Sequence, residues 1–210
     1  TKRTETFRFV DVPSRPVPSL LQGFSAPVRL TIDLSDRDLE FLVANDTDLF
    51  NRWQSANVYA TRTLIANVEL LKEGKRATRG LAFAKALGLA MADKNLNPAY
   101  RAELLRLPSQ ADIAREIGRN VDPDLVYRAH SHLTKLVATT LGEELEAIYG
   151  GSSPRGPFSP DARSAGAQAA PGGEMLAGDD VLRIRHPRRL RDQAEALLRD
   201  LARLRADSAW

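Results

Sequence analysis

The stretch SDRDLEFLVANDTDLFNRWQSANVYATRTLIANVELLKEG, residues 35–74, contains the pattern that decides the fold of this chain. Ser35 and Asp38, three positions later, have the spacing of a helix-capping box. A first apolar helix face follows at Leu39, Leu42 and Val43. A second helix is predicted to begin after Asp48 and to end at Gly74, with one face formed by Phe50, Trp53, Asn57, Ala60, Leu64, Val68 and Leu71.

Further helix starts follow this stretch, each marked by a capping residue or by proline at the first helical position. They are Thr78, Asn97 with Pro98, Ser109 with Asp112, and Asp122 with Pro123, the last helix reaching Tyr149. Helices joined by short loops pack as antiparallel neighbours, and no repeat of fixed period is visible. We therefore expect a mainly α fold of irregular antiparallel helix pairs, similar to an α-solenoid.

The residues before Ser35 follow the two-residue period of β-strands instead. Phe7 and Phe9 share one face, and a second run alternates apolar Val28, Leu30, Ile32 and Leu34 with polar Arg29, Thr31 and Asp33. The connection between the two runs contains four prolines, which lack the amide donor of a central strand: Pro13, Pro16, Pro18 and Pro27. The sequence therefore predicts two half-buried strands, joined by an extended edge segment, before the helices.

The composition changes after Tyr149. Residues 151–180 are rich in glycine, proline, alanine and serine and are predicted to form a linker. Residues 181–210 regain a helical pattern and are predicted to form a basic amphipathic helix, whose entrance carries a basic patch of Arg183, Arg185, Arg188, Arg189 and Arg191. The expected division is 1–34 for the β segment, 35–150 for the helical domain, then the linker and the basic helix.

The overall composition indicates which kinds of partner and which cellular compartment to expect. The 210 residues include 30 lysine and arginine against 27 acidic residues, a net charge of +3, which does not indicate nucleic acid as a partner. Cysteine is absent, which fits a reducing compartment, so we expect the cytoplasm. No apolar stretch has the length of a membrane span or a secretion signal, and a chain that opens at Thr1 is expected to be a fragment.

The histidines and carboxylate pairs that could bind a metal or act in catalysis are better explained as structural residues. His130 and His132 stand two apart on a predicted helix and point in nearly opposite directions, so one metal ion cannot reach both, and an ordinary helix surface is favoured. His186 has no ligand-spaced partner. Three carboxylate pairs fall at caps or on polar faces: Asp36 with Asp38, Asp46 with Asp48, and Glu143 with Glu144. No zinc-protease, phosphate-loop or nucleophile-elbow motif is present, so we predict no catalytic, metal-binding or cofactor-binding residue.

Several stretches together resemble bacterial aminopeptidase N, a zinc metalloaminopeptidase family of the gluzincin type. They are FRFVDVPSRPVPSLLQGFSAPVRL, SDRDLEFLVANDTDLFNRW, LLRLPSQADIA, and DPDLVYRAHSHL with ELEAIY, in the family's order between about Thr6 and Asp161. The most specific residues of this family-like motif are Pro16, Val17, Pro18, Leu20, Gly23, Phe24, Ser25, Ala26, Pro27, Val28, Phe50, Asn51, Arg52 and Trp53. From spacing alone, Trp53 with Phe50 is expected to be a core residue rather than a ligand platform.

The resemblance implies that catalysis and scaffolding belong to different domains of the parent enzyme. The first strands would finish an Ig-like β-sandwich, and Ser35 would begin the family's C-terminal α-helical domain. In such enzymes the zinc, its glutamate base and the substrate's amino group are held in a catalytic domain upstream, and none of those motifs occurs here. The implied role is a non-catalytic scaffold, inactive alone, that packs on the upstream catalytic domain and limits peptide access to a parent enzyme that removes N-terminal residues.

The sequence departs from that family after FSPDARSAG, where an alanine-, glycine- and arginine-rich tail replaces further helices. These residues have GC-rich codons, so we expect a frameshifted or truncated C-terminus, which sequencing the gene across this region would test. The alternative function is a free-standing helical interaction module whose basic patch binds an acidic partner or nucleic acid, with binding that weakens steeply with salt.

Overall fold

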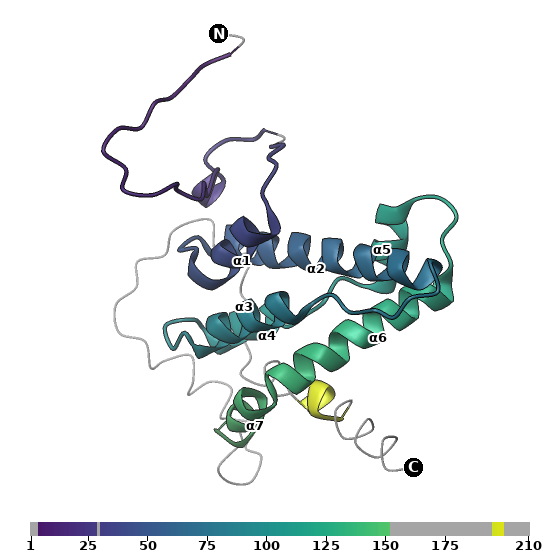
Figure 1. Ribbon diagram of the computed structural model, residues 1–210. Coiled ribbons are helices and arrows are strands. Elements are labelled where there is room, and N and C mark those ends of the chain that lie inside the picture. Colours follow the sequence, from purple (N-terminus) through teal and green to yellow (C-terminus); the bar gives the residue numbers. More distant parts are fainter. Residues whose placement is uncertain (1–3, 29, 152–194, 200–210) are drawn as a thin grey trace.

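The computed structural model describes residues 4–28, 30–151 and 195–199 (Figure 1). Among these residues the chain is mainly helical and contains no β-strand. The elements are the 3-10 helix η1 (Gln22–Phe24) and the helices α1 (Asp36–Asn45), α2 (Leu49–Lys72), α3 (Leu81–Ala92), α4 (Pro98–Leu104), α5 (Gln110–Ile117), α6 (Pro123–Thr140) and α7 (Gly142–Gly151).

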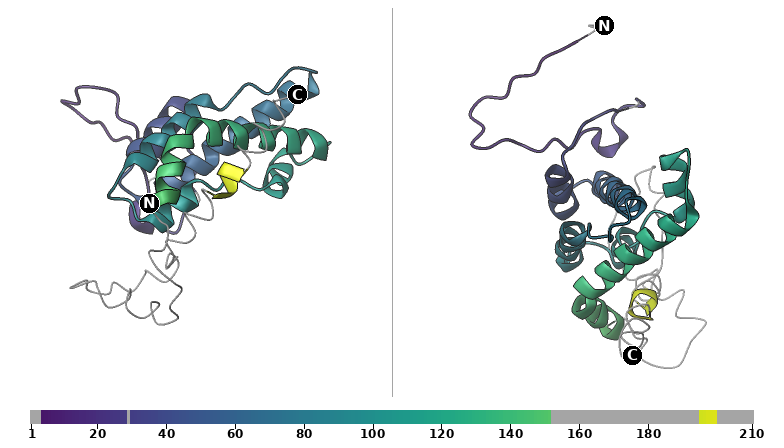
Figure 2. Two further views of the ribbon diagram at one scale, coloured as in Figure 1. Left: turned by 90° about the horizontal axis from the view of Figure 1, so that it is seen from below. Right: turned by 45° about the vertical axis from the view of Figure 1, so that its right-hand side comes forward.

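The helices form packed layers. α1 packs along α2, and α3 packs against both α1 and α2 on the side away from the N-terminus (Figures 1 and 2). α6 crosses α2 and α3, while α5 and α7 pack at the two ends of α6. This arrangement confirms the prediction of packed helices joined by short connections.

Capping residues start the helices where the sequence predicts them. Ser35 Oγ accepts the amide of Asp38, and the Asp38 carboxylate accepts the amide of Ser35 in return, which completes the capping box of α1. Asp48 accepts the Asn51 amide at the start of α2. Equivalent bonds start α5 at Ser109 and α6 at Asp122. Each of these side chains satisfies an amide that has no partner inside its helix.

The start of α3 differs from the prediction at Thr78, because the helix begins at Leu81. Asn67, fully buried on α2, accepts the amides of Thr78 and Arg79 at Oδ1, and its Nδ2 donates to the Arg79 carbonyl. These bonds hold residues 78 and 79 against α2. Gly80 follows with φ of 128°, and a Cβ atom there would lie 2.5 Å from Leu133 Cδ1 on α6, so any other residue would strain the backbone and displace Leu133.

The helix predicted to run from Pro123 to Tyr149 is two helices. α6 ends at Thr140, and Leu141 leaves helical geometry with φ of −105° and ψ of 15°. The Leu141 side chain is buried in the core, next to the position of Gly88 on α3. The break between α6 and α7 thus coincides with a buried tertiary contact of Leu141, which spacing does not reveal.

The core lies where α2, α3 and α6 meet. Its largest fully buried side chains include Leu64, Phe83, Leu87 and Leu133. The Tyr59 ring meets the edge of the Phe83 ring, with centroids 5.5 Å apart at 84°. Half of the buried residues of α3 are alanine, namely Ala84, Ala86 and Ala90, and these small side chains allow the neighbouring helices to approach closely.

The two predicted strands are not formed among the residues that the structure describes. Residues 4–15 and 30–33 contain no helix or strand there, and residues 30–33 make no backbone–backbone hydrogen bond with any other described residue. Val28, Leu30 and Ile32, expected to be half-buried, are exposed. A strand needs a neighbouring strand for its amides and carbonyls, and none is present among these residues.

The C-terminal predictions fall largely beyond the described residues. Gly151, the first residue of the predicted linker, is the last residue of α7. The rest of the linker and most of the basic helix at 181–210 lie outside the described residues, of which residues 195–199 are helical. Leu197 and Leu198 in that short piece pack against the helical core. The expected domain boundaries, and the frameshift, stay predictions.

Candidate functional site

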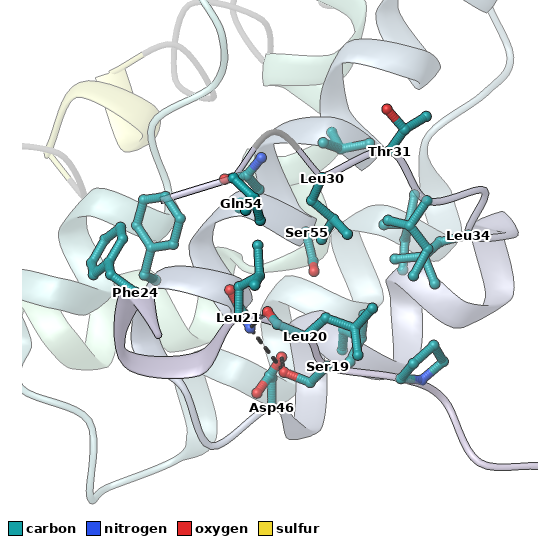
Figure 3. Close-up of a pocket in the computed structure, with 18 of the residues that line it drawn as sticks. Ser19, Leu20, Leu21, Phe24, Leu30, Thr31, Leu34, Asp46, Gln54 and Ser55 are labelled. Atoms are coloured by element: carbon teal, nitrogen blue, oxygen red, sulfur yellow. Dashed lines mark hydrogen bonds between the residues drawn. The ribbon is translucent and has the colours of Figure 1, made fainter. Parts of the chain in front are cut away.

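The best-defined site is the junction, by which we mean the contact of residues 15–34 with α1 and α2. This N-terminal segment crosses the two helices and encloses with them a pocket of about 600 Å³ (Figure 3). The segment and the helices both contribute apolar side chains to the pocket, among them Leu21, Phe24, Leu30, Leu34, Leu39, Leu42, Phe50 and Val58. The pocket therefore lies between the extended segment and the helical body.

A polar cluster fastens one end of the junction. Ser19 Oγ donates to Asp46 Oδ2 over 2.8 Å and accepts a hydrogen bond from Asn51 Nδ2 over 3.0 Å (Figure 3). Asn51 Nδ2 also donates to the Leu20 carbonyl over 2.8 Å. Asp46, a buried carboxylate at the end of α1, accepts the Asp48 amide as well, so its burial is matched by hydrogen bonds.

Asp48 fastens the same end through the backbone. One of its carboxylate oxygens accepts the Asn51 amide and caps α2, and the other accepts the Gly23 amide over 2.9 Å. The Phe24 ring then packs on the Phe50 ring, with centroids 4.6 Å apart. Gly23, Phe24, Phe50 and Asn51 belong to the two halves of the family-like motif, so the structure brings these distant halves of the sequence together at the junction.

The other end of the junction is held by arginine. Arg15 Nη2 lies 3.2 Å from Asp38 Oδ2, and Arg62 Nη1 donates to the Leu34 carbonyl over 2.6 Å. The hydrogen bonds from the Ser35 hydroxyl and amide hold the pKa of Asp38 below its usual value, and Arg15 adds to this effect. The Asp38 carboxylate therefore stays ionised and serves both as a helix cap and as a partner of the segment.

Arg52 connects three helices beneath the junction. Its side chain is 4% exposed, and it donates from Nε to the Val43 carbonyl and from Nη2 to the Ala44 carbonyl at the end of α1. Nη1 donates to Asp93, which follows α3. The amide of Asn95 is the main cause of the lowered pKa of Asp93, and Arg52 contributes. Sequence analysis treated Arg52 only as part of a motif; the signal for its role is a charged residue on a buried helix face.

Trp53 and the two α6 histidines are structural. Trp53 is half-buried and packs against the core, as predicted, with its ring centroid 5.9 Å from that of Phe50. His130 and His132 are half-buried rather than surface residues, and burial lowers the pKa of both imidazoles. His130 faces Pro108 and His132 faces Arg79, so the rings lie against different loops.

The remaining predicted groups do not form a reactive cluster. Across the described ranges, no group of three or more histidine, cysteine, aspartate or glutamate side chains could hold a metal ion. Within the same ranges, no helix is long and apolar enough to cross a membrane. His186 and the basic patch of Arg183, Arg185, Arg188, Arg189 and Arg191 lie outside the described residues.

Two domain families match the chain on either side of Ser35. Residues 1–33 match DUF3458, a domain of unknown function described as having an Ig-like fold. Residues 36–170 match DUF3458_C, described as ARM repeats. The boundary between the two matches coincides with the change from the extended segment to α1.

The relatives found by sequence are aminopeptidases. Aminopeptidase N of Caulobacter vibrioides is 37% identical over 164 residues, which are 78% of this chain and 18% of that protein. Aminopeptidase N of Escherichia coli is 36% identical over 149 residues, 71% of this chain and 17% of that protein. The chain therefore spans less than a fifth of the length of these curated relatives.

A solved structure shares the fold. The crystal structure of Legionella pneumophila aminopeptidase A in complex with aspartic acid superposes with a TM-score of 0.65 at 22% sequence identity, covering 97% of this chain and 22% of that one. Together with the two domain matches and the sequence relatives, this likeness assigns the residues to one region of a larger protein. The chain belongs to the aminopeptidase N family, in which it corresponds to the end of the Ig-like DUF3458 domain and to the ARM-repeat helical C-terminal domain.

Proposed function

We propose that this chain is a non-catalytic scaffold within an aminopeptidase N-type enzyme. Its helices pack on a catalytic domain upstream and limit the access of peptides to the active site. The observation that carries the proposal is the junction, where the segment that matches the Ig-like family is fastened to the first helices of the ARM-repeat match. Such a joint transmits a fixed orientation from the upstream domains to the helical stack.

The state of the polar groups at the junction supports a structural role. Asp38, Asp46 and Asp48 are each occupied as a helix cap or as an acceptor for the segment. In this proposal, the upstream catalytic domain of the parent enzyme holds the zinc and removes N-terminal residues from peptides. The cytoplasm, expected from the lack of cysteine, is part of the same proposal.

The proposal is tested by reconstitution. The chain is mixed with the catalytic portion of Escherichia coli aminopeptidase N from which the matching C-terminal region has been removed. Zinc-dependent cleavage is followed on an aminoacyl arylamide and on peptides of increasing length. We expect a complex in size-exclusion chromatography and a fall in the cleavage of long substrates relative to short ones, because the helices cover the active-site entrance.

Two controls test whether a change in cleavage arises because the helices cover the active-site entrance. The chain alone is assayed for bound zinc and for arylamide hydrolysis, and both are expected to be absent. A chain carrying Phe24→Ala and Asn51→Ala, with a loosened junction, is expected to restore less length discrimination than the unmodified chain. Hydrolysis by the chain alone, or a complex whose length preference is unchanged, would contradict the scaffold role.

A further inference from the structure

Two histidines of α6 hold the backbone just before the starts of two other helices. His132 forms a hydrogen bond with the backbone of Arg79, the residue before the N-cap of α3. His130 forms one with the backbone of Pro108, the residue before the N-cap of α5. Because α6 packs against both α3 and α5, the two rings fasten the connections into these helices to one common helix (Figure 1).

Both imidazoles donate to a carbonyl in these bonds. Proline has no amide, so the Pro108 backbone can only accept. The Arg79 amide already donates to Asn67 Oδ1, which leaves the Arg79 carbonyl as the acceptor for His132. A neutral imidazole has one N–H donor and one unprotonated nitrogen. Each ring therefore uses its single proton on a carbonyl.

The surroundings of the rings favour this neutral state. His132 Nε2 is buried and has no hydrogen-bond partner among the described residues. His130 Nδ1 lies 3.4 Å from Thr134 Oγ1, so this side of the ring faces a hydroxyl group. Burial lowers the pKa of both rings, and each is neutral at pH 7 in the folded chain.

Charged groups around the rings do not compensate for protonation. No carboxylate of the described residues raises the pKa of either ring, and Lys135 on α6 lowers that of His132 further. α2 presents the neutral Asn67 to the connection at Arg79. The other charged groups on the neighbouring elements are cations, paired carboxylates or an exposed carboxylate: Arg76 and the Arg79 side chain before α3, Lys85 on α3, Glu69 with Lys72 on α2, Glu103 with Arg106 at α4, Asp112 with Arg115 on α5, and Glu116 at the end of α5.

We propose that His130 and His132 are a pair of pH-dependent clasps, which hold the starts of α3 and α5 on α6 while the rings are neutral and release them when the rings are protonated. An imidazolium at His132 would place a second N–H at a buried position without an acceptor, so the charged ring moves toward water and leaves the Arg79 carbonyl. The start of α3 depends more on its clasp, because its N-cap provides no side-chain hydrogen bond, whereas α5 keeps a complete capping box.

The direction of the pH effect follows from the two states of the chain. The pKa of each ring in the folded chain lies below its ordinary value of 6.5, which applies to the unfolded chain. The unfolded chain therefore binds protons first as the pH falls. The stability that the clasps provide is fully present well above pH 6.5, and it is lost as the pH falls from there toward the folded-state pKa values.

The test measures urea unfolding of the full chain at pH 7.5 and pH 5.5, followed by circular dichroism, for the unmodified chain, His130→Gln, His132→Gln and the double variant. Glutamine keeps a side-chain N–H for the carbonyl and does not titrate. A ring that stays neutral in the folded chain lowers the folding equilibrium constant about tenfold between these two pH values. Each single variant is expected to remove up to about tenfold of the fall, and the double variant to remove both contributions.

Hydrogen exchange of the unmodified chain locates the effect. After correction for intrinsic rates, exchange at residues 77–80 is expected to rise more between pH 7.5 and pH 5.5 than exchange in the centre of α2, and His132→Gln should abolish the difference. His186→Gln, which removes the remaining histidine and neither clasp, is the matched control and should retain the pH dependence of the unmodified chain.

A titration that needs no variant to fold completes the test. Nuclear magnetic resonance of the imidazole protons in the unmodified chain is expected to give two histidines that titrate below pH 6.5. A purely structural role would change stability equally at both pH values. The proposal is therefore overturned by a double variant with unchanged pH dependence, by His186→Gln that removes as much of it, by a uniform rise in exchange, or by either α6 ring titrating at or above pH 6.5.

Discussion

At the scale of single residues, the polar groups that sequence analysis treated as surface or motif positions organise the helical body. Arg52 is the clearest case, because a buried guanidinium connects the end of α1 with Asp93 after α3. Planar, multi-donor geometry suits arginine to this task, and a lysine ammonium cannot reach the same set of acceptors. Asp46 is the second case, since its burial depends on Ser19 of the segment.

Replacing Arg52 by alanine should lower the free energy of unfolding by about 3 kcal/mol, because it removes the arginine partner of the Val43 and Ala44 carbonyls and of Asp93. Arg52→Lys should recover only part of this loss. Urea denaturation followed by circular dichroism measures both. Arg62→Ala removes an exposed arginine from the junction and serves as the control, with an expected change within about 1 kcal/mol. Equal effects of Arg52→Ala and Arg62→Ala would show that the buried network contributes nothing specific.

At the scale of elements, most helix starts are set by a capping residue that bonds a nearby amide. A contact from another helix determines the start where it takes the same amides. Ser35, Asp48, Ser109 and Asp122 begin helices as their spacing predicts, since each cap bonds an amide two or three residues away. The start of α3 is different, because Asn67 on α2 takes the amides that a helix from Thr78 would use. A side chain on another helix therefore determines this boundary.

Asn67→Ala should destabilise the fold by about 3 kcal/mol, because the amides of Thr78 and Arg79 and the Arg79 carbonyl lose their buried partner. Hydrogen exchange should rise first at residues 77–80, the connection into α3, which native-state exchange with mass spectrometry can locate. Asn57→Ala, at a half-buried position of the same helix, is the matched control and is expected to cost less than about 1 kcal/mol. Unchanged exchange at the connection would contradict the role of Asn67.

At the scale of the whole molecule, the junction joins a segment without regular hydrogen-bonded structure to a well-packed helical body. The segment is held by a few hydrogen bonds, the Arg15–Asp38 ion pair and one aromatic contact, whereas the helices share a continuous core. The two parts should therefore open independently, with the segment released at a much lower free energy than the helices.

Ser19→Ala combined with Asn51→Ala should release the segment while the helices remain folded. Each lost hydrogen bond contributes about 1 kcal/mol, so hydrogen exchange and limited proteolysis within residues 18–24 should increase by roughly tenfold or more. The far-ultraviolet circular dichroism spectrum should be unchanged. Asn45→Ala, which removes an exposed amide that bonds only within α1, is the control. Loss of helicity together with release of the segment would show that the two parts are one cooperative unit.

The sequence by itself determined the helical class, most helix starts, the change of structure at Ser35 and the membership in a family of aminopeptidases. These features depend on short-range spacing or on residue identity, and both can be read directly from the sequence. Tertiary structure alone decided that Arg52 and Asn67 are buried connectors and that Leu141 lies between two helices. It also decided that the two motif halves meet, with Phe24 packed on Phe50 and Asn51 bonded to the Leu20 carbonyl. It decided as well that residues 31–33 make no backbone–backbone hydrogen bond with another described residue, because a strand exists only where another backbone lies alongside to accept its hydrogen bonds.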